Sequence, residues 1–145
     1  MTRRLLPRAR RGVAAVEFAL TVGVLLAVLL GIVELSMLMA RQYVVSRAAR
    51  DACRVGSGVL EGANPTGDQI TAAADAHARF ALEAAGVPCT DDNCTVTSTW
   101  YESDGWYVLK VVVSVDYDPL TGFLPVIPRE TRSQFIMLTQ QQIWD

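Results

Sequence analysis

The stretch "RRGVAAVEFALTVGVLLAVLLGIVELSMLMA", residues 10–40, decides the fold of this 145-residue chain. After its first two residues, only Glu17 and Glu34 carry a charge. Phe18–Ala40 alone is 23 residues long, which as a helix measures roughly 35 Å and is enough to cross a bilayer. The stretch therefore predicts a membrane-spanning helix near the N-terminus.

This helix divides the chain into a basic leader at 1–12, a transmembrane helix at 13–40 and a domain at 41–145. The leader contains five arginines and no acid: Arg3, Arg4, Arg8, Arg10 and Arg11. Without them, 8 basic side chains stand against 15 acidic ones. Because an acidic domain lacks the basic surface that nucleic acid requires, we expect no nucleic-acid partner.

Three interpretations compete for the apolar run. A cleaved signal peptide would be shorter, would lack Glu17, and would place a small residue two positions before Ala40, where Leu38 stands. A plain single-span anchor fits the length. Arginines flank it on both sides, so the positive-inside rule favours a cytoplasmic N-terminus by only a small margin. The third interpretation starts from the carboxylate.

Glu17 needs a reason, because a charged carboxylate inside a membrane helix costs on the order of 2–3 kcal/mol at the bilayer centre. If the chain is cut after Gly12, Val13 acquires a free α-amine, and Glu17 lies one turn further along the same face. In a low dielectric the amine and the carboxylate attract strongly, and each is costly alone. The pair can form within one helix or between neighbouring helices.

"RRGVAAVEFAL", residues 10–20, resembles the processing site of type IV pilin-like proteins: basic leader, glycine, cleavage point, and glutamate at the fifth mature position. The continuation "LLGIVELSMLMARQYVVSRAARDACRVGS", residues 29–57, is similar to the TadE-like family of the Tad (tight adherence) pilus system. That family shares a G-hydrophobic-x-E run, here Gly31–Glu34, and an arginine- and alanine-rich stretch, here Ala40–Arg54. The resemblance covers residues 10–58.

The resemblance implies that Gly12 ends the leader, that Val13 is the mature N-terminus and that Glu17 serves in assembly. Phe18 stands where major Tad pilins usually have tyrosine, a change expected of minor or pseudopilin members. The implied function is that of a membrane-anchored pseudopilin or minor pilin, processed by a prepilin peptidase and involved in pilus assembly. Implied partners are that peptidase, other pilin-like subunits, the Tad assembly machinery and the lipid bilayer. The implied location is the inner membrane, with the C-terminal domain outside.

Small side chains recur at every fourth position of the apolar run: Ala15, Ala19, Gly23, Ala27 and Gly31. Such strips let membrane helices approach closely, although alanine and glycine are also simply common in membrane helices. Glu34, near the outer end of the run, is expected to be a solvated or paired structural residue.

The sequence of the domain predicts an α+β fold. In this fold the first helix continues to about Val55 and is stopped by Gly56 and Gly58. Thr66 and Gln69 resemble a capping box for a second helix that ends near Ala85, before Gly86 and Pro88. Its predicted packing face is Ile70, Ala74, His77, Ala81 and Ala84. His77, the single histidine, has no partner at ligand or catalytic spacing and is expected to be a core-edge residue.

Three strands are expected at 94–100, 106–117 and 130–140, because these stretches are rich in β-branched and aromatic residues. The second alternates cleanly between an apolar face and a mixed face, and Asp104-Gly105 before it predicts a hairpin turn. The sheet should pack on the outer half of the first helix in a pilin-like architecture. The proline-rich link at 118–130 is expected either to cover the sheet or to form a surface for a neighbouring subunit.

The three cysteines fit no common zinc pattern. If the domain lies outside the membrane, Cys89 and Cys94 can close a small disulfide loop, which leaves Cys53 unpaired unless it takes one of them. No catalytic triad, Cys-His pair or carboxylate pair is visible, so we expect no enzyme, no cofactor, no metal and no small-molecule substrate. The alternative function is an uncleaved single-pass membrane protein with an extracytoplasmic sensor or binding domain.

Overall fold

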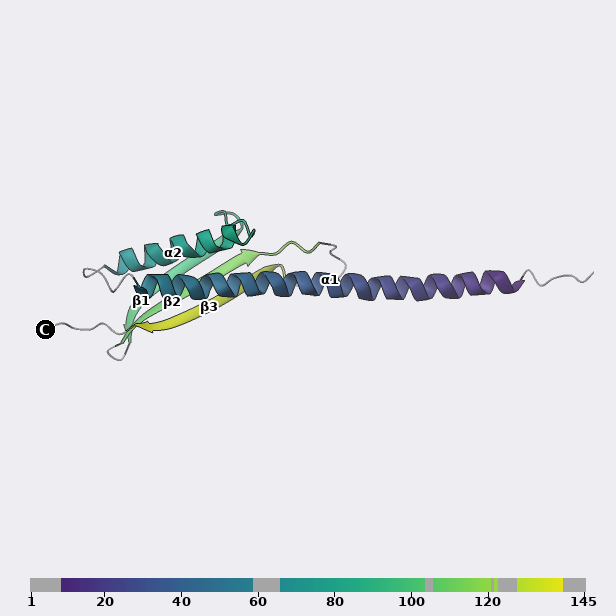
Figure 1. Cartoon of the computed structure of the whole chain (residues 1–145), viewed down its shortest axis with the longest axis horizontal. Helices are drawn as coiled ribbons and strands as arrows, with labels where there is room; N and C mark the ends of the chain where they lie inside the picture. Colours follow the sequence, from purple (N-terminus) through teal and green to yellow (C-terminus); the bar gives the residue numbers. More distant parts are fainter. Residues whose placement is uncertain (1–8, 59–65, 104–105, 121, 123–127, 140–145) are drawn as a thin grey trace, which may run out of the picture.

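The computed structural model describes residues 9–58, 66–103, 106–120, 122 and 128–139. Its elements follow in the order α1 (Ala9–Gly58), α2 (Gly67–Ala84), β1 (Cys94–Ser103), β2 (Trp106–Asp116) and β3 (Glu130–Thr139). Figure 1 shows the later half of α1 lying along the sheet beside α2, while the earlier half projects alone. The predicted α+β, pilin-like architecture is confirmed. The later half of α1 forms one unit with α2 and the sheet, and we call this unit the head.

Helix α1 runs unbroken for 50 residues, about 75 Å at 1.5 Å per residue. The prediction that it stops at Gly56 is wrong. A Cβ at Gly56 would lie 2.6 Å from Leu109 Cδ2 and 3.1 Å from the Cβ of Ala74. The glycine therefore serves a close approach between α1, α2 and the sheet, and this contact outweighs the weak helix propensity of glycine.

The projecting half of α1 is long and apolar enough to cross a membrane, and none of its most apolar window is buried against the head. Large side chains such as Val13, Leu20 and Val24 are 60–68% exposed there. Apolar surface of this extent is costly in water. This half of α1 thus has the character of a membrane anchor.

Helix α2 begins as predicted: the Thr66 backbone N–H donates to Gln69 Oε1 at 3.1 Å. It ends at Ala84, and Gly86 follows with a φ of 76°, in the left-handed region that glycine adopts readily. The predicted packing face is partly wrong, because His77 is only half-buried and Ala84 is exposed. The buried face consists of residues four apart: Ile70, Ala74, Ala78 and Leu82.

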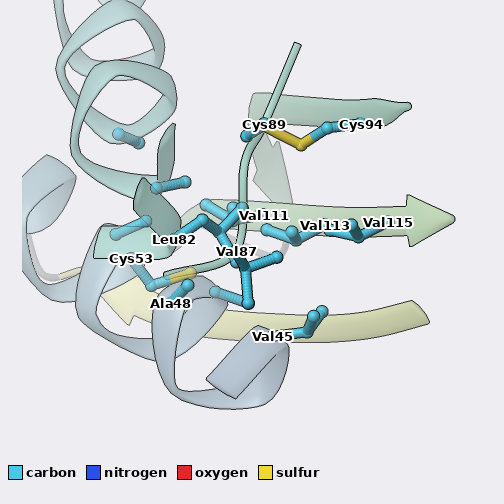
Figure 2. Close-up of a cluster of buried hydrophobic side chains, with 14 of the residues drawn as sticks. Val45, Ala48, Cys53, Leu82, Val87, Cys89, Cys94, Val111, Val113 and Val115 are labelled. Carbon is cyan, nitrogen blue, oxygen red and sulfur yellow. A yellow bond between two sulfur atoms is a disulfide. The ribbon is translucent and has the colours of Figure 1, made fainter. Parts of the chain in front are cut away.

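The sheet is antiparallel in the order β1-β2-β3, so β2 is central. Ser103 pairs with Trp106, which leaves a two-residue connection as the hairpin prediction requires; residues 104 and 105 themselves lie outside the described part. The predicted alternation of β2 is confirmed, since every second residue from Leu109 to Val115 is fully buried. Figure 2 shows Val111, Val113 and Val115 facing Val45 and Ala48 of α1 and Leu82 of α2.

Alanines dominate the helix faces that cover the sheet, including Ala48, Ala49 and Ala52 of α1. Because their side chains are short, the helices pack closely on the larger valines of β2. Cys53 is buried and free in this core, and its thiol donates toward the carbonyl of Phe135 at 3.5 Å. A disulfide joins Cys89 to Cys94, the first residue of β1 (Figure 2).

Candidate functional site

The Gly12–Val13 peptide lies within the first turns of the projecting half of α1. Gly12 has no other atom within 4 Å of the position its Cβ would take, and the Val13 side chain is 60% exposed. No packed structure among the described residues therefore shields this peptide bond. Residues 1–8 of the leader lie outside the described part.

Glu17 follows one turn later on the same helix and is exposed, as is Phe18 at 71%. Thr21 Oγ1 donates to the backbone carbonyl of Glu17 at 2.8 Å, so the carboxylate itself stays available. Across the described part of the chain, Glu17 forms no ion pair. An exposed carboxylate in an apolar helix can pair with a cation from its own N-terminus or from another helix.

The strip of small residues lies on this same projecting half of α1. Ala15, Ala19 and Gly23 are exposed, while Ala27 and Gly31 are half-buried. A methyl group added at Gly23 would meet nothing within 4 Å, so the backbone of this residue is open to another helix. The strip leaves room for close contact along the first half of its length.

Glu34 was expected to be a solvated or paired structural residue, and the structure shows the paired form. It is fully buried, and its Oε1 accepts a hydrogen bond of 3.2 Å from the backbone N–H of Gly122. Gly122 belongs to the connection between β2 and β3, 88 residues away along the chain. Helical spacing places Glu34 on the same face of α1 as Leu38, Arg41 and Val45, and this face continues the packing face of the helix beyond the sheet. This spacing was the signal in the sequence that Glu34 would be buried.

Three arginines of α1 contact a carboxylate or an aromatic ring. Arg47 pairs with Asp51 at 3.5 Å, one turn away. Two others lie over aromatic rings, each 5.8 Å from the ring centroid: Arg41 over Tyr117 and Arg50 over Phe135. Such cation–π contacts attach α1 to the edge of the sheet.

His77 lines an open groove between α1 and α2 with Tyr43 and Phe80. Its ring centroid is 6.3 Å from that of Phe80. Among the described residues no group of His, Cys, Asp and Glu could hold a metal ion. The groove is lined by apolar side chains together with the charged side chains of Arg47 and Asp51 and the imidazole of His77.

The comparisons with known proteins agree with this geometry. The family model described as "TadE-like protein" matches residues 12–54, which comprise the bare half of α1 and the part that packs on the sheet. Neither a search of curated proteins nor a search of solved structures gave a match. The resemblance drawn from the sequence is confirmed over residues 12–54, which are similar to the TadE-like family.

Proposed function

We propose that this chain is a membrane-anchored pseudopilin or minor pilin of a Tad-type pilus. In this proposal a prepilin peptidase cuts between Gly12 and Val13, and the mature protein takes part in pilus assembly. The observation that carries the proposal is Glu17, an exposed carboxylate on a bare apolar helix, in a segment that matches the TadE-like family. The chain is a substrate of peptide cleavage and performs no reaction itself.

Cleavage gives Glu17 its role. The new α-amine at Val13 is four residues away, about 6 Å along the helix axis. In the membrane a positive terminus and a carboxylate stabilise each other, because each is poorly solvated by lipid. A subunit whose carboxylate pairs with the terminus of a neighbour is thereby positioned along the helix axis relative to that neighbour.

The strip of small residues supplies the surface for this neighbour. With Ala15, Ala19 and Gly23 exposed, a second pilin-like helix can lie close enough for backbone contact and dispersion. The proposed partners are accordingly other pilin-like subunits and the Tad assembly machinery, besides the bilayer and the peptidase.

The proposed location is the inner membrane, with the N-terminus in the cytoplasm and the head outside. The disulfide between Cys89 and Cys94 supports this orientation, because disulfides persist in oxidising compartments and are rare in the cytosol. The similar numbers of arginines on both sides of the anchor add little to this argument.

The N-terminus of the protein purified from membranes tests the proposal. Mass spectrometry of the terminal peptide should give a chain beginning at Val13, and Gly12→Trp should leave the leader in place. A mature, functional protein that keeps residues 1–12 would refute processing. That result would favour the single-pass sensor or binding protein.

A further inference from the structure

The described residues that follow β2, 117–120 and 122, lie along α1 on the side of its projecting half. Toward the anchor, Gln42 Nε2 of α1 donates a 2.9 Å hydrogen bond to the carbonyl of Arg132 in β3. The Gly122 N–H, by contrast, meets α1 at Glu34. The eight positions between Glu34 and Gln42 correspond to about 12 Å along the helix axis. Figure 1 shows the chain leaving β2 and running beside α1 toward its projecting half.

The length of the anchor locates the border of the bilayer. Val13–Val33 is 21 residues, roughly 31 Å of helix, which equals the hydrocarbon thickness of about 30 Å. When the hydrocarbon is taken to begin at Val13, directly after the basic leader, it ends at about Glu34. The following residues up to Ala40 cross the headgroup layer, and Arg41 is the first basic residue beyond it.

The connection presents an apolar side chain at this level. Leu120, two residues before Gly122, is 67% exposed. Its neighbours on the anchor at the same depth are also exposed and apolar: Leu35 at 48%, Met37 at 47% and Met39 at 66%. Together these side chains continue the lipid-facing surface of the anchor onto the connection.

We propose that Leu120, in the described segment that follows β2, makes a second membrane contact by inserting into the outer interface of the bilayer beside α1. The partner is a lipid surface. This inference requires only that α1 is a membrane anchor, and it does not depend on cleavage after Gly12 or on pilus assembly.

The hydrogen bond between Glu34 and Gly122 suits this position. A carboxylate and a backbone N–H are each costly at the edge of the hydrocarbon when they lack a partner. Paired at 3.2 Å, with Glu34 fully buried, they are both withdrawn from lipid. The pair thereby allows the polar backbone of the connection to approach the membrane while Leu120 faces outward.

The depth of a probe at position 120 tests the inference. The full-length chain, with Leu120→Cys labelled by an environment-sensitive fluorophore, is reconstituted in phosphatidylcholine vesicles. Quenching is then measured with phosphatidylcholine that carries a nitroxide at a shallow acyl position, for positions 120 and 138, and at a deep acyl position, for position 24. Leu138→Cys is the matched control, because Leu138 is 65% exposed and lies at the opposite end of the sheet. Val24→Cys, at a position 67% exposed on the anchor, reports insertion of α1.

We expect quenching at position 120 to exceed quenching at position 138 several-fold and to approach quenching at position 24. Quenching at 24 without quenching at 120 would overturn the inference while leaving the anchor intact. If quenching failed at both positions, the anchor and the inference would fail together. A probe at 120 that is shielded from water only at high protein density, and is not quenched by lipid, would indicate a second copy instead and would also overturn it.

The role of Glu34 is tested with the same probe at position 120. Glu34→Ala removes the acceptor, so quenching should fall toward the level of position 138. Glu34→Gln keeps an acceptor oxygen and should retain most of the quenching. Unchanged quenching in Glu34→Ala would show that Glu34 does not hold the connection at the bilayer.

Discussion

Glu34 of the anchor helix and Gly122 of the β2–β3 connection are joined by a 3.2 Å hydrogen bond across 88 positions of chain. The contact lies outside the main core, which begins at Val45. It lies about three helical turns before Val45. A helix that leaves a domain without such a contact is free to move from its last core residue onward.

Glu34→Ala should lower the free energy of unfolding of the head by about 1–2 kcal/mol, because a hydrogen bond to a charged acceptor is lost. Glu34→Gln should cost less, since it keeps an oxygen in the same place. Thermal unfolding of the detergent-solubilised chain, followed by tryptophan fluorescence, measures both. Equal stability of the alanine variant and the parent would contradict the expectation.

Gly56→Ala should destabilise the protein by about 1–3 kcal/mol, the usual cost of overpacking a core. The added methyl would lie 2.6 Å from Leu109 Cδ2 and 3.3 Å from the Ile70 carbonyl oxygen. Gly58→Ala is the control, because its methyl would meet nothing within 4 Å. The control should be neutral or slightly stabilising, since alanine favours helix. Urea unfolding measures the free energy of unfolding of both variants. Similar losses of stability in the two would rule out the close approach at Gly56 as the cause.

The disulfide between Cys89 and Cys94 should contribute about 2 kcal/mol, the value expected from chain entropy for so short a loop. The two residues are five positions apart. Reductant should lower the unfolding midpoint of the parent chain and of Cys53→Ala alike. The double variant Cys89→Ser/Cys94→Ser should start at the lower midpoint and show no response to reductant.

Cys53 should be almost inert to alkylation in the native protein. Burial raises the pKa of its thiol from 9.0 to about 11. At pH 8 the thiolate fraction is then about 100-fold smaller than for an ordinary cysteine, and the fold also blocks access. Iodoacetamide labelling followed by mass spectrometry should give slow modification in buffer and rapid modification in urea. Fast labelling of the native protein would contradict the burial.

The same thiol predicts a pH dependence of stability. Because burial raises its pKa from 9.0 to about 11, the unfolded chain loses the Cys53 proton in this pH range while the native protein keeps it. The unfolded state then binds fewer protons, so the contribution of the protonated thiol is fully present below the lower value and is lost as the pH rises toward the upper one. Cys53→Ala, compared with the parent by urea unfolding in neutral and in alkaline buffer, should show a smaller loss of stability.

Glu17→Ala should leave cleavage after Gly12 intact but impair pilus assembly, because the new α-amine loses its counter-charge. Glu83→Ala, which removes an exposed carboxylate from α2, is the control and should assemble normally. Electron microscopy of cells complemented with each variant gives the readout, with the mature N-terminus checked in parallel. Normal piliation in Glu17→Ala would refute the role of Glu17 in assembly.

Periodicity in the sequence was enough to predict the long helix, the second helix and the three strands. In β2 the alternation of apolar residues determines which face is buried, because a shift by one residue would turn Val111, Val113 and Val115 to the other side. The Thr66–Gln69 pattern likewise located the start of α2, since capping depends on residues close in the chain.

The errors arose where tertiary contacts decide the outcome. Gly56 is a poor helix former on its own, but its contact with Leu109 keeps it helical. The sequence does not define which face of α2 is buried, because alanines occur around most of the helix. Glu34 could not be paired in advance, because its partner is a backbone N–H of an irregular connection.

The continuity of α1 has a mechanical consequence. No glycine or proline interrupts the helix between Ile32 and Val55, so its backbone hydrogen bonds run without a hinge from the bare half into the core. A rotation or tilt of the anchor therefore turns the head by the same angle. A force along the helix axis moves the anchor and the head together. The hydrogen bond between Glu34 and Gly122 attaches the segment after β2 to the helix, so Gly122 must move with α1.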